Sequence, residues 1–124
     1  MTPREAKAVE KWFKRTIGLS DWNIDVSMDH PQMELGGDIP PIERNGWLGR
    51  CIPRVDLRKA AIWVNSGGHD ESQHASPLGT LFHELLHIFF ASCGMDSSNL
   101  EADYAVNQIA SALELLYEAQ ENMK

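Results

Sequence analysis

Two histidines and a glutamate stand at metal-ligand spacing in the segment His83-Glu84-Leu85-Leu86-His87. If this segment is helical, His83 and His87 lie one turn apart on the same face, where their ring nitrogens can bind one ion at about 2.0–2.1 Å. Glu84 lies about 100° further round the helix, so it is placed to reach a water molecule at an open coordination position rather than to bind the ion. The His-Glu-x-x-His spacing therefore predicts a Zn²⁺ site in which Glu84 acts as the general base.

The sequence around these residues predicts the helix that carries them. Ser76 is a suitable N-cap and Pro77 a suitable first residue, and the apolar pattern continues to about Phe90. Apolar side chains would cover almost the whole circumference, which is typical of a buried helix. Polar groups inside such a helix need partners, and a metal ion supplies one. The competing interpretation is a structural domain without metal, in which both histidines bind backbone carbonyl groups and Glu84 lies at the surface.

A third protein ligand is needed, because two histidines alone hold zinc poorly. A further helix, predicted at about residues 100–121, would fold back on the first after a short turn. Its predicted inner face consists of apolar residues at helical spacing: Ala102, Val106, Ile109, Leu113 and Leu116. Glu101 and Asp103 flank Ala102, so the spacing does not choose between these two carboxylates as the metal ligand. Acids at a helix N-terminus also occur without any ligand, since the helix dipole favours them.

The remaining sequence predicts the elements that position this site. A helix is expected over residues 3–17, with Thr2 as its N-cap and Gly18 at its end. Strands are expected at residues 22–26, at about 47–53 and at 60–65. The intervening segments 29–46 and 66–76 are rich in turn-forming residues and are predicted as loops. The order predicts one α+β domain over residues 1–124, with a small three-stranded sheet on one side of the central helix and a C-terminal helix after it.

Charge and composition restrict the partners. The net charge is −7, from 18 acidic and 11 basic residues, so we expect no nucleic-acid binding. No apolar run approaches the roughly 18 residues of a membrane span, and the first residues do not resemble a signal peptide, so no membrane association is expected. Cys51 and Cys93 form no CxxC pair and are predicted as buried thiols in a reducing compartment, which indicates the cytoplasm.

The chain resembles the minimal zincin metallopeptidases of phages and bacteria, including the ImmA/IrrE family. The resemblance rests on the His83–His87 segment and on a second signature, whose positions are matched by Asp103, Val106, Asn107, Ile109, Ala110 and Leu113. It implies a gluzincin-like core, in which a small sheet and the His-Glu-x-x-His helix precede a helix with an acidic third ligand. In this register Asp103 takes the place of that ligand, which is usually Glu in the family. Asp is one methylene shorter, so Glu101 remains the alternative.

The resemblance implies a zinc-dependent peptidase that hydrolyses peptide bonds in a protein or peptide substrate, with Glu84 activating the zinc-bound water. For a phage-encoded protein the compartment would be the host cytoplasm. Tyr104, His69 and His74 are candidates for stabilising the oxyanion. An extended peptide could pair with the third strand if that strand is an edge of the sheet. The alternative function is a catalytically silent zinc-binding protein of the same fold that acts through protein–protein contacts.

Overall fold

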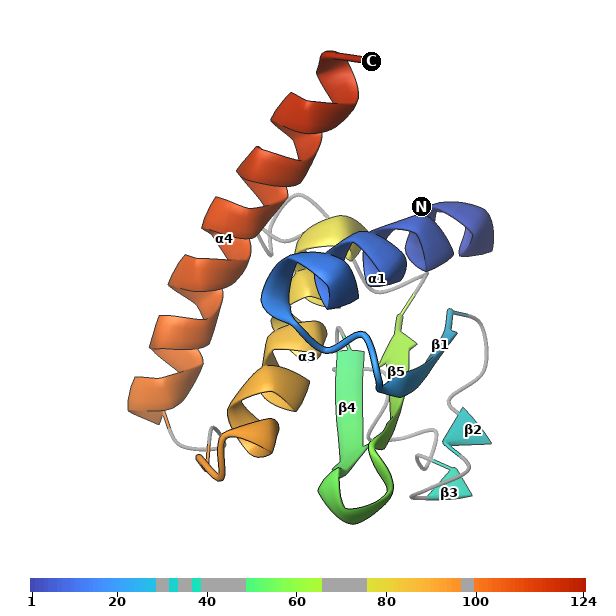
Figure 1. The fold of residues 1–124 in the computed structure, drawn as a ribbon, viewed down its shortest axis with the longest axis vertical. Helices are drawn as coiled ribbons and strands as arrows, with labels where there is room; N and C mark the ends of the chain where they lie inside the picture. Colours follow the sequence, from blue (N-terminus) through green and yellow to red (C-terminus); the bar gives the residue numbers. More distant parts are fainter. Residues whose placement is uncertain (29–31, 34–36, 39–48, 66–75, 97–99) are drawn as a thin grey trace.

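The computed structural model describes residues 1–28, 32–33, 37–38, 49–65, 76–96 and 100–124. Its elements follow in the order α1 (Pro3–Ile17), β1 (Asn23–Ser27), β2 (Gln32–Met33), β3 (Gly37–Asp38), β4 (Gly49–Arg54), a 3₁₀ turn (Val55–Leu57), β5 (Lys59–Val64), α3 (Pro77–Ser92) and α4 (Leu100–Asn122). The predicted α+β fold is confirmed: an N-terminal helix and a three-stranded mixed sheet are followed by two helices (Figure 1). Within the described residues, no helix combines the length and the apolar character that crossing a bilayer requires.

The ends of α1 form as the sequence predicts. The Thr2 hydroxyl accepts a hydrogen bond from the backbone N–H of Glu5 at 3.1 Å, which satisfies one of the free donors at the helix start. Gly18 has a φ of 93°, a left-handed conformation that glycine adopts with least strain. Its N–H and that of Leu19 both bond to the Lys14 carbonyl. These caps fix where α1 stops, and therefore where the chain turns towards β1.

β5 is the central strand of the sheet, between β1 and β4. It runs parallel to β1 and antiparallel to β4, with Ile62 opposite Val26 on one side and Cys51 on the other. The expectation that an extended peptide could pair with this third strand is therefore wrong, because both of its edges are occupied. β1 and β4 are the two edge strands, and each leaves one edge without a strand partner among the described residues. Pro53 lies in β4, and a residue without an N–H is tolerated best in an edge strand.

Segment 29–46, predicted as one loop, contains the two short strands β2 and β3, which pair antiparallel. The rest of that segment and most of the predicted loop 66–76 lie outside the described residues.

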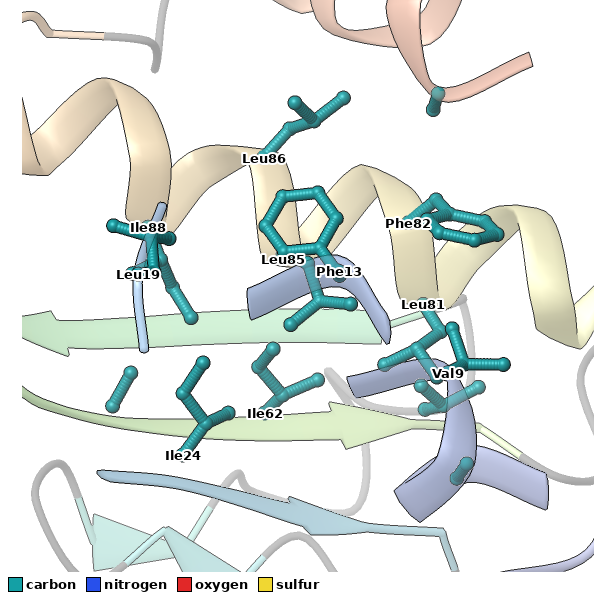
Figure 2. Packing of buried hydrophobic residues seen from close by; sticks show 14 of the residues in the cluster. Val9, Phe13, Leu19, Ile24, Ile62, Leu81, Phe82, Leu85, Leu86 and Ile88 are labelled. Atoms are coloured by element: carbon teal, nitrogen blue, oxygen red, sulfur yellow. The ribbon is translucent and has the colours of Figure 1, made fainter. Parts of the chain in front are cut away.

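The core lies between the sheet and the two helices α1 and α3. Ile24 and Ile62 project from the sheet towards Leu85 and Ile88 of α3, and Phe13 of α1 packs beside them (Figure 2). Full burial of one such aliphatic side chain stabilises a fold by about 1.5–3 kcal/mol. The opposite face of the sheet has a smaller cluster around Ala61 and Trp63. Because β5 is covered on both faces, five of its six residues are buried.

α4 packs on α3 through a different stripe from the predicted one. Val106 and Ala110 are buried and Leu113 and Tyr117 are partly buried. Two residues predicted on the inner face are exposed, Ile109 by 40% and Leu116 by 45%, so that part of the prediction is wrong. Two apolar stripes run side by side along this helix, and sequence spacing alone cannot tell which one faces the core.

A contact with α1 fixes the rotation of α4. The Trp12 indole N–H donates to the Gln120 side-chain oxygen at 2.9 Å. The Trp12 ring also packs edge-on against Phe82 of α3 and Tyr117 of α4. Three helices therefore meet at one aromatic group, which holds the stripe containing Tyr117 inward.

The prediction of buried thiols is wrong for Cys93, which is exposed. Cys51 is partly buried in β4, where it packs against the core. Cys93 directly follows the last residue of α3. The chain turns away from the core at this point, so the thiol is exposed although a free cysteine is usually buried.

Candidate metal centre

The start of α3 is fixed by a side-chain cap. The Ser76 hydroxyl accepts from the N–H of Gly79 at 2.9 Å, and Pro77 is the first helical residue. This cap fixes the residue at which α3 begins, and His83 and His87 follow in the helix one turn apart. Their Nε2 atoms point to the same spot and lie 3.1 Å apart, and their ring centroids are 4.8 Å apart. The predicted convergence of the two imidazoles is therefore present.

The first turn of α4 brings a carboxylate to these histidines. Asp103 Oδ1 lies 3.2 Å from His83 Nε2. His83, His87 and Asp103 together form a group that could hold a metal ion, with one ligand atom from each lying within 4.8 Å of the others. Glu101, the alternative carboxylate in the sequence, is exposed and does not belong to this group. The two residues are separated by about 200° around the helix, so only one of them can face α3.

Asn107, one turn after Asp103, determines which nitrogen of His83 is available. Its Oδ1 lies 2.7 Å from His83 Nδ1. An amide oxygen can only accept, so Nδ1 is the protonated nitrogen and a neutral His83 presents a lone pair at Nε2. That lone pair faces the Asp103 carboxylate and the second imidazole. Three electron-rich atoms at this separation attract a cation.

The donor set and its spacing fit zinc. Two ligand atoms that each lie about 2.0–2.1 Å from one ion at the tetrahedral angle are about 3.3 Å apart. The observed separations of 3.1 and 3.2 Å are close to that value. The pKa of His87 is lowered, first by burial and then by His83, although Asp103 opposes the shift. His87 therefore stays neutral near pH 7 and keeps a lone pair for a cation.

Glu84 is buried beside this group, with only 6% of its surface exposed. The interpretation that placed it at the surface is therefore wrong. Burial, and then repulsion by the Asp103 carboxylate, raise the pKa of Glu84 to about 8, although Arg50 of β4 acts in the opposite direction. A carboxyl group with such a pKa can both take up and release a proton near neutral pH, as general acid–base catalysis requires.

A cleft of about 850 Å³ opens over these residues. One wall is β4, and the other walls come from α3, the turn after it and the start of α4; the lining residues include Arg50, Cys51, Glu84, His87, Met95 and Asp103. Burial, and then the Glu84 carboxylate, raise the pKa of the Cys51 thiol well above its usual value. Cys51 is therefore a protonated wall residue and not a thiolate ligand or nucleophile.

Gly49 allows β4 to approach α3 this closely. A Cβ atom at this position would lie 2.8 Å from Thr80 Cγ2 and 3.3 Å from Glu84 Cγ, and 2.8 Å from the Trp63 carbonyl oxygen. Contacts below 3.0 Å between such atoms require the neighbours to move. The absence of a side chain at Gly49 therefore sets the distance between the strand and Glu84.

Of the three residues predicted as oxyanion donors, the structure describes only Tyr104. Tyr104 is 68% exposed and is not among the residues that line the cleft, and His69 and His74 lie outside the described residues. Conversely, the roles of Gly49, Arg50 and Asn107 were not predicted. Asn107 lies four residues after Asp103 and so on the same side of α4, a spacing that could have indicated it. Gly49 and Arg50 have no such signal, because only the tertiary structure brings β4 to α3.

Comparison with known proteins gave no match: no protein-family model, no curated protein and no solved structure is similar to this chain. The functional interpretation therefore rests on the geometry of the site.

Proposed function

We propose that this protein is a zinc-dependent peptidase of the zincin type that hydrolyses peptide bonds in a protein or peptide substrate. The observation that carries the proposal is that His83 Nε2 lies 3.1 Å from His87 Nε2 and 3.2 Å from Asp103 Oδ1. This group lies next to a buried Glu84 in an open cleft. A structural zinc site has four protein ligands and no need of an adjacent carboxylic acid, whereas a catalytic site has three and keeps one position open.

Each residue of the site has a defined task. His83, His87 and Asp103 would hold the ion, and Asn107 keeps His83 in the tautomer that binds through Nε2. Zinc supplies Lewis acidity at such a site, which makes water nucleophilic near neutral pH and polarises a carbonyl group. Glu84 accepts a proton from the attacking water as the C–O bond forms, and gives it to the amine nitrogen as the C–N bond breaks. Arg50 favours the ionised form of Glu84 that starts this cycle.

The cleft suits an extended chain as substrate. β4 forms one wall of it, and the outer edge of β4 has no strand partner among the described residues. The backbone groups on such an edge can pair with an added strand. A peptide bound along β4 would pass Glu84, because Gly49 brings the strand against that residue.

Metal content is the first test. Protein purified without chelator or metal-affinity resin should contain close to one zinc ion per chain by plasma mass spectrometry. The double variant His83→Ala, His87→Ala should contain none while keeping its helical circular dichroism. If wild-type protein takes up no zinc even after reconstitution, the metal site and the peptidase proposal both fail.

Hydrolysis is the second test, on a pool of quenched fluorescent peptides of randomised sequence. Glu84→Gln should keep its zinc and lose cleavage by about 10²–10⁴-fold, the range expected for loss of a general base. Full activity in this variant would contradict the mechanism. Exposed Glu118 of α4 provides the matched control, because Glu118→Gln removes an equal charge away from the metal centre.

The competing function is that of a catalytically silent zinc-binding protein that acts through protein–protein contacts. The exposed apolar side chains on α4 favour it, since such surfaces mark contact sites. This version predicts bound zinc and no cleavage of any peptide in the pool, and it predicts that wild type and Glu84→Gln behave alike in every assay.

A further inference from the structure

The outer side of α4 carries an apolar stripe that no described element covers. Large side chains recur every seventh residue at Ile109, Leu116 and Met123, and alanines recur likewise between them. The stripe, here called the α4 seam, consists of Ala105, Ile109, Ala112, Leu116, Ala119 and Met123, all of them exposed. Its alternating spacing of four and three residues is that of a coiled-coil contact face. The seam extends over about 27 Å of helix.

From Ala105 onwards the charges on α4 avoid this seam, and Glu101 lies one turn before it. The helix is acidic, yet its acids after Ala105 stand elsewhere on the circumference, at Glu114, Glu118 and Glu121. One flank of the seam is the stripe that packs on α3. The residues on the other flank, away from α3, are the uncharged Gln108, Leu115 and Asn122. In a chain of net charge −7, two copies repel one another over most of their surface. The α4 seam is a long uncharged strip on which that repulsion is smallest.

We propose that the α4 seam binds the α4 seam of a second copy of this chain, with the two helices antiparallel. The alternation of large and small residues selects this partner. In a parallel pair equal positions meet, so leucine would face leucine and alanine would face alanine, which gives uneven layers. About an axis between Ala112 and Leu116, an antiparallel pair sets each large residue against an alanine: Leu116 against Ala112, Ile109 against Ala119, and Met123 against Ala105. Such layers fill space evenly.

The shape of the molecule determines where the two folded bodies lie in such a pair. The C-terminal end of α4 extends past the other elements, which lie beside the earlier part of the helix (Figure 1). A parallel partner would place the two folded bodies at the same level of the helix pair. An antiparallel partner places them at opposite ends. Leu115, which is 69% exposed, flanks the seam beside the symmetry axis and would contact its own copy.

Sedimentation velocity of the whole chain in the presence of a chelator tests for the dimer. The protein concentration is varied over about 5–200 µM, because an interface of this size is expected to have micromolar affinity. Leu116→Glu should raise the dissociation constant by at least about 100-fold, because each copy would bury an unpaired carboxylate. Ala112→Glu, also on the exposed seam, should do the same if the first variant folds poorly. Ser111→Glu, exposed on α4 but outside the seam, should leave the dimer intact. A monomer at every concentration, or a dimer unaffected by both seam variants, would overturn the proposal.

Disulfide trapping tests the orientation, in a Cys93→Ser background that removes the exposed native thiol. Leu115→Cys should form an intermolecular disulfide readily, because the two copies of this residue meet beside the axis. Gln108→Cys should not, since it would lie opposite Asn122 of the other copy. The reverse result would rule out the antiparallel arrangement. None of these measurements depends on zinc or on hydrolysis, so they stand or fall separately from the proposed function.

Discussion

Replacing Glu84 by glutamine should make the metal-free protein more stable, and increasingly so as the pH rises. The Glu84 pKa is raised from 4.5 to about 8 in the folded chain. Since the raised value belongs to the folded state, the folded chain binds more protons than the unfolded chain between these two pH values. Stability from this group is therefore fully present below pH 4.5, falls as the pH rises, and is lost above about pH 8. Glutamine remains neutral throughout and avoids this loss.

The size of the effect follows from the shift. A difference of about 3.5 pH units at about 1.36 kcal/mol each gives close to 5 kcal/mol as an upper value. Local relaxation around an ionised carboxylate reduces this, so we expect about 3 to 5 kcal/mol between pH 5 and pH 9. Small domains have total stabilities of about 5–15 kcal/mol, so the wild-type chain should be markedly weaker at pH 9 than the variant.

Urea unfolding followed by tryptophan fluorescence measures this, because Trp12, Trp22 and Trp63 are buried. Free energies of unfolding of wild type and Glu84→Gln are compared in chelator at intervals from pH 5 to pH 9. Titrating groups that do not interact with Glu84 contribute equally to both proteins. The difference therefore reports on position 84 together with Asp103 and Cys51, which interact with it. Exposed Glu118→Gln is the control and should track wild type. Parallel curves for wild type and Glu84→Gln would refute the inference that the buried carboxyl group resists ionisation.

Three further changes test the site. Asp103→Ala should abolish zinc binding whereas Glu101→Ala should not, which is measured by zinc titration with a competing chromophoric chelator; equal losses in both would contradict the assignment of Asp103. Asn107→Ala should weaken zinc binding by about 10–100-fold, because His83 would no longer be held in one tautomer. An unchanged zinc affinity in the same titration would show that Asn107 does not contribute to the site. Gly49→Ala should destabilise the chain by about 1–3 kcal/mol in urea unfolding, because the added methyl group forces β4 away from α3; wild-type stability would show that the strand moves freely.

The sequence was sufficient for the three long helices, for the three-stranded sheet and for the convergence of the histidines, although not for the short strands β2 and β3. Helix ends depend on local chemistry, and Thr2, Gly18 and Ser76 act within a turn of their own positions. His83 and His87 meet because four residues make about one helical turn, whatever surrounds the helix. These features need no knowledge of distant residues.

The rotation of α4 could not be read from the sequence. Two apolar stripes one residue apart both satisfy helical spacing, and the predicted face mixed Val106 from one with Leu116 from the other. The packing of Val106 and Ala110 against α3, together with the Trp12–Gln120 hydrogen bond, decides between them. The same rotation decides between the two candidate carboxylates, because it turns Asp103 towards His83 and leaves Glu101 exposed.

The sequence by itself therefore determined the helix that carries His83, Glu84 and His87, since residues four positions apart meet through local geometry alone. Only the tertiary structure decided the third member of the cluster, the edge strand beside it and the raised pKa of Glu84. Each of these depends on the distance between segments far apart in the chain: β4 against α3 through Gly49, and α4 against α3 through Asp103. Burial and electrostatic repulsion depend on such distances, and spacing along a sequence does not contain them.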